Sequence, residues 1–218
     1  MQQIRITCHQ INARKSLVLP ICHNTLRVLF LCNGCVTANE TLLSERTVFI
    51  EDPLKTLVLA ADTNSLILEI IYPVTTAEFC EAAPKSYPYV LAYKEAPTYT
   101  EDCKSATTVS RMLVPPRILP GFSMGSVQAE GPDLIAPHCH GNVDQYFFGL
   151  SENNCVALID GCRHAFTRNE LLHIPLNSIH GVLLEENQSC HYLWIDFLLS
   201  EEALLYMDQA HKMEGGSL

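Results

Sequence analysis

The sequence predicts an all-β protein made of two similar β-barrels, with a short helix at the C-terminal end. Apolar residues fall in short runs that turn residues interrupt at close spacing, which is the pattern of a β-sandwich or barrel. The runs form two sets that resemble one another, which indicates an internal repeat. Only the residues after Leu199 carry clear helix signals, with Ser200 as a cap and Glu201 and Glu202 in the first turn.

The composition is that of a globular protein with a sizeable core. Of the 218 residues, 48 % are hydrophobic and 17 % are charged, which is too apolar for a disordered protein. The 14 lysine and arginine residues against 24 acidic residues give a net charge of −10. This balance argues against nucleic acid or an anionic membrane as the main partner, because both attract clustered cations.

The sequence shows no membrane or export signal. It contains no run of about 18 apolar residues, and the start, Met1 to Arg5, lacks the apolar stretch of a secretory signal. We therefore expect a cytoplasmic protein whose partner is a small molecule or a second copy of itself in a homodimer.

The first set of strands is expected within residues 1–79. Four apolar runs are separated by turn residues such as Glu51-Asp52-Pro53, and Pro73 closes the set. The runs are Leu26–Leu31, Leu42–Ile50, Thr56–Ala60 and Ser65–Tyr72.

Residues 80–106 differ in character, with three prolines among four tyrosines. We interpret them as a long connection over the surface, with one short helix from Ala77 to Ala83. A second set of strands then fills residues 107–200, in which Asp160-Gly161 predicts a two-residue hairpin. Residues 201–218 form the helix and a tail, and we expect Gly215-Gly216 to end the helix.

The two sets can be aligned, with chance similarity as the alternative. Asn33-Gly34-Cys35 matches Asp160-Gly161-Cys162 at an offset of 127. At an offset of 124, three further matches follow: Thr47–Ile50 with Leu171–Ile174, Val58-Leu59 with Val182-Leu183, and Asn64-Ser65 with Gln188-Ser189. This order supports a duplicated unit.

Ten cysteines are present, and we expect most to be reduced, buried thiols. The one C-x-x-C segment is Cys32-Asn33-Gly34-Cys35. Half of a zinc site or a redox pair are possible functions. A zinc ribbon needs a second pair, however, and Asn-Gly is a hairpin signal, so two thiols beside a turn are the favoured interpretation.

The histidines at positions 138, 140 and 180 carry the clearest chemical signal. On a strand, residues two apart share a face, so His138 and His140 would point the same way and Cys139 the other. Two adjacent imidazoles are readily satisfied by a divalent transition metal. The hairpins in between can bring His180 beside them.

These residues resemble the two motifs of the cupin family. The first motif is Gly, five spacers, His-x-His, three or four spacers, Glu, six spacers and Gly. Here Gly131 is followed after six spacers by His138-Cys139-His140 and after four more by Gln145, and the final Gly is out of register. The second is Gly, five spacers, Pro-x-Gly-x-x-His, matched by Asn169, Pro175-Leu176-Asn177 and His180. Asparagine tolerates the positive φ that these glycines adopt. With the repeat, the whole chain resembles a bicupin of double-stranded β-helix, or jelly-roll, barrels.

The resemblance implies a metal held by His138, His140, His180 and a fourth ligand. The family's acidic ligand is replaced by Gln145, a neutral and weaker oxygen donor, with Asp144 as the rival. Neighbours on a strand face opposite ways, so only one of the two can point inward. The aromatic run that follows favours Gln145.

The first copy departs further from the motifs. Projecting the three histidines back by the two offsets reaches Ile11, Ala13 and Thr56. We therefore expect a degenerate N-terminal half without a metal triad, serving as a scaffold, a pocket rim or a dimer contact.

Other residues are weaker candidates for the pocket. They are His164, His173, His191, Tyr146 and Trp194, with Arg111 and Arg117 as possible contacts of an anionic ligand. For each of them, a structural or solvent-exposed role is the favoured interpretation.

Two functions are compatible with such a site. Three histidines and one weak ligand leave coordination positions open, which is typical of a catalytic metal. The resemblance then implies a dioxygenase, isomerase or lyase that uses iron, manganese, zinc or nickel and acts on a small organic molecule. The alternative is a non-catalytic small-molecule-binding or sensory cupin, since the N-terminal half is similar to the ligand-binding arm of arabinose-sensor regulators. The substrate cannot be deduced from fold and motifs alone.

Overall fold

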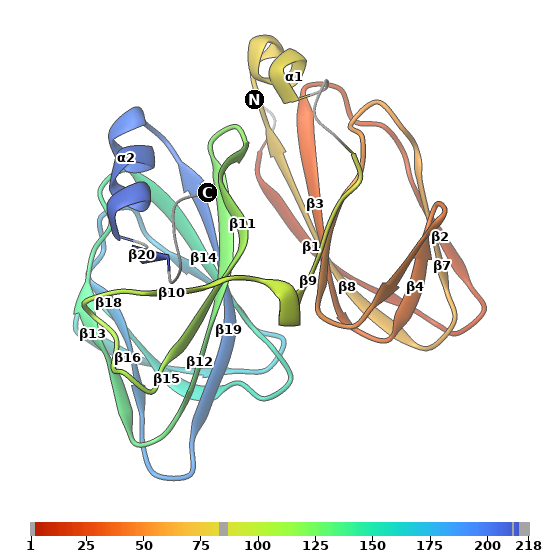
Figure 1. The fold of residues 1–218 in the computed structure, drawn as a ribbon. Helices are drawn as coiled ribbons and strands as arrows, with labels where there is room; N and C mark the ends of the chain where they lie inside the picture. Colours follow the sequence, from red (N-terminus) through yellow and green to blue (C-terminus); the bar gives the residue numbers. More distant parts are fainter. Residues whose placement is uncertain (1–2, 83–86, 211, 214–218) are drawn as a thin grey trace. The chain divides into compact units, whose positions relative to one another are not determined.

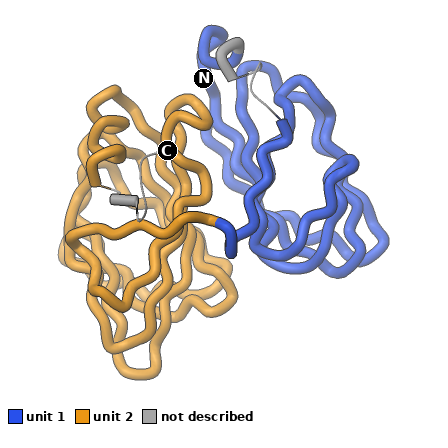
Figure 2. Tube along the Cα trace, viewed as in Figure 1, with its two compact units in different colours: residues 1–95 blue, residues 96–218 orange. Residues whose placement is uncertain are grey.

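The structure, a computed structural model, describes residues 3–82, 87–210 and 212–213. The chain forms two compact units, Met1–Glu95 and Ala96–Leu218 (Figure 2). Both units are almost entirely β, as the sequence predicts. No helix in the described part of the chain is long and apolar enough to cross a membrane.

The first unit contains two antiparallel sheets (Figure 1). One has the order β1 (Arg5–Ile11), β8 (Ser65–Pro73), β3 (Thr25–Asn33), β6 (Thr47–Ile50) and β9 (Tyr89–Ala92). The other has the order β2 (Ser16–Leu19), β7 (Leu57–Ala61), β4 (Cys35–Ala38) and β5 (Thr41–Ser44). Apolar residues of both sheets, including Leu31, Phe49 and Leu59, form one buried cluster, so the unit has its own core.

The second unit is a continuous antiparallel sheet that folds back on itself. Its strands are β10 (Thr98–Thr100), β11 (Val109–Leu119), β12 (Phe122–Glu130), β13 (Asp133–His138), β14 (Val143–Gly149), β15 (Asn154–Ile159), β16 (Cys162–Thr167), β17 (Leu171–Ile174), β18 (His180–Leu184), β19 (Ser189–Leu198) and β20 (Lys212–Met213). The main path runs β13-β18-β15-β19-β12-β11-β10-β20, with β14 on β17 and β19, and β16 on β15. Its core contains Phe147, Phe166, Tyr192 and Trp194.

The strand pairing is the same in both units, which supports the predicted duplication. Strands β1 to β8 correspond in order to β12 to β19. Each strand pair of the first unit has an equivalent in the second. These equivalents are β1–β8 and β12–β19, β2–β7 and β13–β18, β3–β6 and β14–β17, β3–β8 and β14–β19, β4–β5 and β15–β16, and β4–β7 and β15–β18. A jelly roll is thus present twice.

The sequence alignment of the repeat was right in one part and wrong in another. At an offset of 124, β6 coincides with β17, and β8 and β19 begin at Ser65 and Ser189. At an offset of 127, however, Asp160-Gly161 forms the hairpin of β15 and β16, whereas Asn33-Gly34 joins β3 to β4 in the other sheet. A Cβ on Gly34, which has φ +93°, would lie 2.2 Å from Ser65 Oγ, so this corner also requires glycine.

The C-x-x-C segment spans that corner. Cys32 and Cys35 are free thiols in the structure and lie on strands of different sheets. Burial raises the pKa of Cys32 to about 12, so the thiolate needed for redox or zinc chemistry is strongly disfavoured. Two thiols beside a turn describe the segment best, although the turn is not a hairpin.

The segment 80–106, expected as a surface connection, contributes strands to both units. Strand β9 pairs with β6 and is followed by the 3₁₀ turn Tyr93–Glu95, whereas β10 pairs with β11. Tyr93 and Tyr99 are buried and act as core residues, and Pro88 and Pro97 directly precede β9 and β10. The division between the units therefore falls after Glu95.

The two predicted helices are present. Helix α1 spans Thr76–Ala82, and Thr75 and Glu78 form a capping box at its start; Ala83 lies outside the described residues. Helix α2 spans Glu201–Ala210, with Ser200 Oγ accepting a hydrogen bond from the backbone N–H of Ala203 at 3.2 Å. Ala203 and Met207 are its buried residues. The expected terminator Gly215-Gly216 lies outside the described residues.

Candidate metal centre

Two of the three histidines face each other across a strand pair. His138 is the last residue of β13 and His180 the first of β18, and they are register partners at the end of that ladder. The expectation that His138 and His140 share one strand is wrong, because β13 ends at His138. His140 lies two residues beyond the strand end, before the turn at Gly141-Asn142, and its ring still lies 4.8 Å from that of His138 and 5.2 Å from that of His180.

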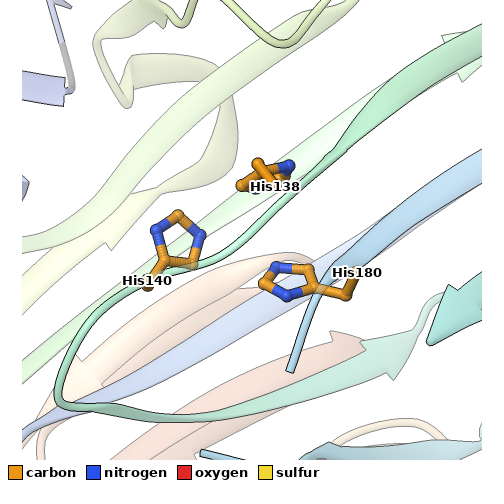
Figure 3. A group of neighbouring side chains, drawn as sticks. All are labelled: His138, His140 and His180. Atoms are coloured by element: carbon orange, nitrogen blue, oxygen red, sulfur yellow. The ribbon is translucent and has the colours of Figure 1, made fainter. Parts of the chain in front are cut away.

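The three imidazoles form a compact group (Figure 3). One ring nitrogen from each lies within 4.8 Å of the others, and the ring centroids are 4.6 to 5.2 Å apart. His140 and His180 are buried, with 7 % and 3 % of their surface exposed, and His138 is half-buried. Within the described residues, this is the one group of histidine, cysteine or acidic side chains with metal-binding spacing.

Backbone carbonyls fix the tautomer of two of the rings. His138 Nδ1 lies 2.8 Å from the carbonyl oxygen of Ala136, and His180 Nδ1 lies 3.2 Å from that of Ser178. Because a carbonyl only accepts, both Nδ1 atoms carry the proton and Nε2 keeps its lone pair. His180 Nε2 is buried and has no hydrogen-bond partner, as expected of a metal ligand.

Electrostatics also keep His180 neutral. Burial, with a smaller contribution from His138, lowers its pKa from 6.5 to about 4. A neutral imidazole at physiological pH is the form that binds a metal.

Gln145 and Asp144, the two candidates for the fourth ligand, take different directions on β14. Asp144 points away and accepts a hydrogen bond from His173 Nε2 at 2.7 Å. Gln145 is buried, with 4 % of its surface exposed, and lines the same cavity as the three histidines.

Asp196 on β19 orients Gln145. The two residues are register partners, and Gln145 Nε2 donates a 2.7 Å hydrogen bond to Asp196 Oδ1. The other amide atom, Oε1, is buried without a hydrogen-bond partner and is therefore available as a ligand. Burial raises the pKa of Asp196 to about 8. Sequence reasoning missed Asp196, although a lone acid within the apolar run Tyr192–Leu198 was a usable signal.

The histidines and Gln145 line a cavity with an empty volume of about 370 Å³. Aromatic and aliphatic side chains form much of the wall: Tyr99, Phe147, Tyr192, Trp194, Val127, Ile135 and Val182. Such walls exclude water and strengthen electrostatic interactions inside the cavity.

One ion pair also lines the cavity. Lys104 Nζ is paired with Glu101, and each side chain is 8 % exposed. Lys104 also donates to Ser110 Oγ at 3.0 Å and to the Tyr99 hydroxyl at 3.4 Å, and that hydroxyl accepts from Trp194 Nε1 at 2.8 Å. The pair was missed because it lies in the segment interpreted as a connection.

Of the weaker candidates, only Trp194 lines the cavity. His173 is exposed and stacks on Tyr146, and His164 is also exposed. Buried His191 lies outside the cavity lining, Arg111 donates to the Ala96 carbonyl, and Arg117 pairs with Asp208.

The first unit carries leucines at the equivalent place. The β2–β7 ladder ends at Leu19 opposite Leu57, both buried, as the β13–β18 ladder ends at His138 opposite His180. The offset of 127 missed Leu19 because it matches the β3–β4 corner with the β15–β16 hairpin, which are not equivalent. The offset of 124 missed Leu57 by one residue, because the β6–β7 connection is one residue longer than the β17–β18 connection. The projected positions Ile11, Ala13 and Thr56 are therefore not the structural equivalents.

Comparison with known proteins identifies the fold. No family model and no curated protein sequence matches this chain. Among solved structures, the cupin 2 conserved barrel domain protein from Leptotrichia buccalis is 15 % identical with a TM-score of 0.58, covering 92 % of this chain and 85 % of its own. The putative glyoxylate-induced protein from Pseudomonas aeruginosa is 10 % identical with a TM-score of 0.74, covering 91 % and 76 %. Oxalate decarboxylase from Bacillus subtilis, which has Mn(II) centres, is 12 % identical with a TM-score of 0.64, covering 90 % and 69 %.

At these identities the similarity establishes the fold alone. The chain therefore has the fold of the cupin superfamily, with two cupin barrels in succession and a histidine triad in the second.

Proposed function

We propose that the second unit binds a divalent transition metal, such as iron, manganese, zinc or nickel, through His138, His140, His180 and Gln145. One observation carries the proposal: three imidazole nitrogens lie within 4.8 Å of one another on the wall of a buried cavity. The unpartnered Nε2 of His180 and Oε1 of Gln145 support it, because leaving buried polar atoms unsatisfied costs about 1–3 kcal/mol each.

The metal would serve an enzyme of the dioxygenase, isomerase or lyase type that acts on a small organic molecule. A bound ion would supply Lewis acidity, or redox activity in the case of iron or manganese. With a metal that takes six ligands, four protein ligands would leave two positions for a substrate. The enclosed aromatic cavity also favours an organic ligand.

The chain's own residues would prepare this site. The carbonyls of Ala136 and Ser178 hold the protons on the outer ring nitrogens, and Asp196 turns the oxygen of the Gln145 amide toward the cavity. Phe147 and Trp194 would exclude water and pack against the apolar part of a substrate.

Metal content of matched variants tests the proposal. We expect the purified chain and His164→Ala, which alters an exposed histidine outside the site, to hold the same metal by elemental analysis. His138→Ala and His180→Ala should lose it while circular dichroism shows an intact fold. A wild-type chain that takes up none of the four metals after purification without chelator would contradict the proposal.

Turnover separates the enzyme from the alternative. A non-catalytic binding or sensory cupin would bind its small molecule and release it unchanged, whereas an enzyme converts it in a reaction that His180→Ala abolishes.

A further inference from the structure

The proposed ligand set carries no charge. Metal ligation requires neutral imidazoles, so His138 and His180 would offer neutral nitrogens, and Gln145 would offer a neutral amide oxygen. A divalent ion bound there would keep its full charge of two, whereas a carboxylate at position 145 would cancel one unit.

The other charged side chains of the cavity do not neutralise that charge. Glu101 and Lys104 form an ion pair and cancel each other. Asp196 contributes at most one negative charge. The rest of the wall is polar but uncharged, aromatic or aliphatic. The loaded cavity would therefore carry a net charge of at least one positive unit, whatever the protonation state of Asp196.

An uncompensated charge in an enclosed site is costly, and a ligand of opposite charge relieves that cost. We propose that the natural ligand of this cavity is a small organic anion that chelates the metal through a carboxylate and a neighbouring oxygen. The inference rests on the metal site proposed above. The empty volume of about 370 Å³, part of which is open to solvent, is the size of a small-molecule site, and the aromatic wall would cover the ligand's carbon skeleton.

A route into the cavity is visible in its lining. Glu101 and His138 also line an adjacent, more open cavity with an empty volume of about 700 Å³, together with Cys103 and Tyr206. A ligand entering there would pass the Glu101 carboxylate, which Lys104 neutralises. Asp102 lines the same entrance, so Lys104 pairs with one of its two carboxylates.

The single tryptophan of the chain, Trp194, lines the cavity and reports binding without a label. We would titrate the zinc-loaded protein with malonate, a chelating dicarboxylate, and with propanediol, a neutral molecule with the same carbon skeleton. Calorimetry would measure affinity in parallel, and the metal content would be checked after each titration. We expect malonate to bind at least about tenfold more tightly than propanediol, and only when zinc is present.

Charge variants of the ion pair provide the second test. Lys104→Gln leaves Glu101 unneutralised and should weaken malonate binding about tenfold or more. The double variant Glu101→Gln with Lys104→Gln restores the net charge and should recover the affinity to within about threefold of wild type. Thermal unfolding confirms that each variant is folded, and the double variant carries the test if the single one is not.

The outcomes distinguish the two proposals. Zinc uptake with equal or no binding of malonate and propanediol overturns the anion inference and leaves the metal site standing. Malonate binding that persists without zinc also overturns it. Failure to take up zinc or any other candidate metal overturns both.

Discussion

Replacing His180 with leucine should remove the metal site and stabilise the metal-free protein. The first unit already has this arrangement, because buried Leu57 opposite Leu19 stands where the second unit has His180 opposite His138. In the metal-free second unit, buried His180 Nε2 lacks a partner, at a cost of about 1–3 kcal/mol. The variant also loses the hydrogen bond from Nδ1 to the Ser178 carbonyl, which lowers the gain in the free energy of unfolding by about 1 kcal/mol. We therefore expect His180→Leu to raise the free energy of unfolding by about 0–2 kcal/mol at pH 7.

The effect should grow on acidification. Burial lowers the pKa of His180 from 6.5 to about 4, so the unfolded chain takes up a proton before the folded one does. Wild-type stability is therefore fully present above pH 6.5 and is lost as the pH falls toward 4. At about 1.4 kcal/mol per pH unit, the advantage of His180→Leu over the wild type in free energy of unfolding should be about 2 kcal/mol larger at pH 5 than at pH 7.

Urea unfolding of the metal-free proteins at both pH values measures this prediction, with His164→Leu as the control at an exposed histidine. The reasoning fails if His180→Leu destabilises the protein by more than about 1 kcal/mol at pH 7. It also fails if the wild type and the variant lose stability equally between pH 7 and pH 5.

Three further changes test the surroundings of the site. Gln145→Glu should tighten zinc binding about tenfold or more, because it adds a negative charge to the ligand set. Competition with a chromophoric chelator measures the zinc affinity. An unchanged or weaker affinity would show that position 145 is not a ligand. Gly181→Ala should lower the free energy of unfolding by about 2 kcal/mol or more, because its Cβ would lie 2.6 Å from the Ile135 carbonyl oxygen. Urea unfolding measures this change, and an unchanged free energy of unfolding would contradict the close packing of β13 on β18. Asp196→Asn should stabilise the metal-free protein at pH 7 by up to about 4 kcal/mol, because the pKa of Asp196 is raised from 3.8 to about 8 and wild-type stability falls as the pH rises through this range. The free energy of unfolding of both proteins, measured against pH, tests this, and two parallel curves would refute it.

The fold could be predicted from the sequence because its signals are local. Apolar runs ended by turn residues indicated the strands, and the capping residue Ser200 lies where the C-terminal helix begins. What failed was the assignment of register. Asn-Gly at 33–34 has the same preference for positive φ in a hairpin as in a corner between sheets, and only the pairing partners separate the two.

The candidate site, like the fold, could be predicted from the sequence in one part and not in another. His138, His140, His180 and Gln145 stand at motif spacing, so the sequence could assemble them. Asp196, Glu101 and Lys104 reach the cavity through strand pairing and through a segment without periodicity. Their contribution depends on burial, which the spacing of residues along the chain does not report.

The most direct test of the account is a crystal structure of the zinc-loaded protein with anomalous diffraction at the zinc absorption edge. We predict one strong peak per chain, in the second unit, about 2.0–2.2 Å from Nε2 of His138 and His180, from one ring nitrogen of His140 and from Oε1 of Gln145. No peak at the three histidines, or a peak at the cysteines in its place, would contradict the account.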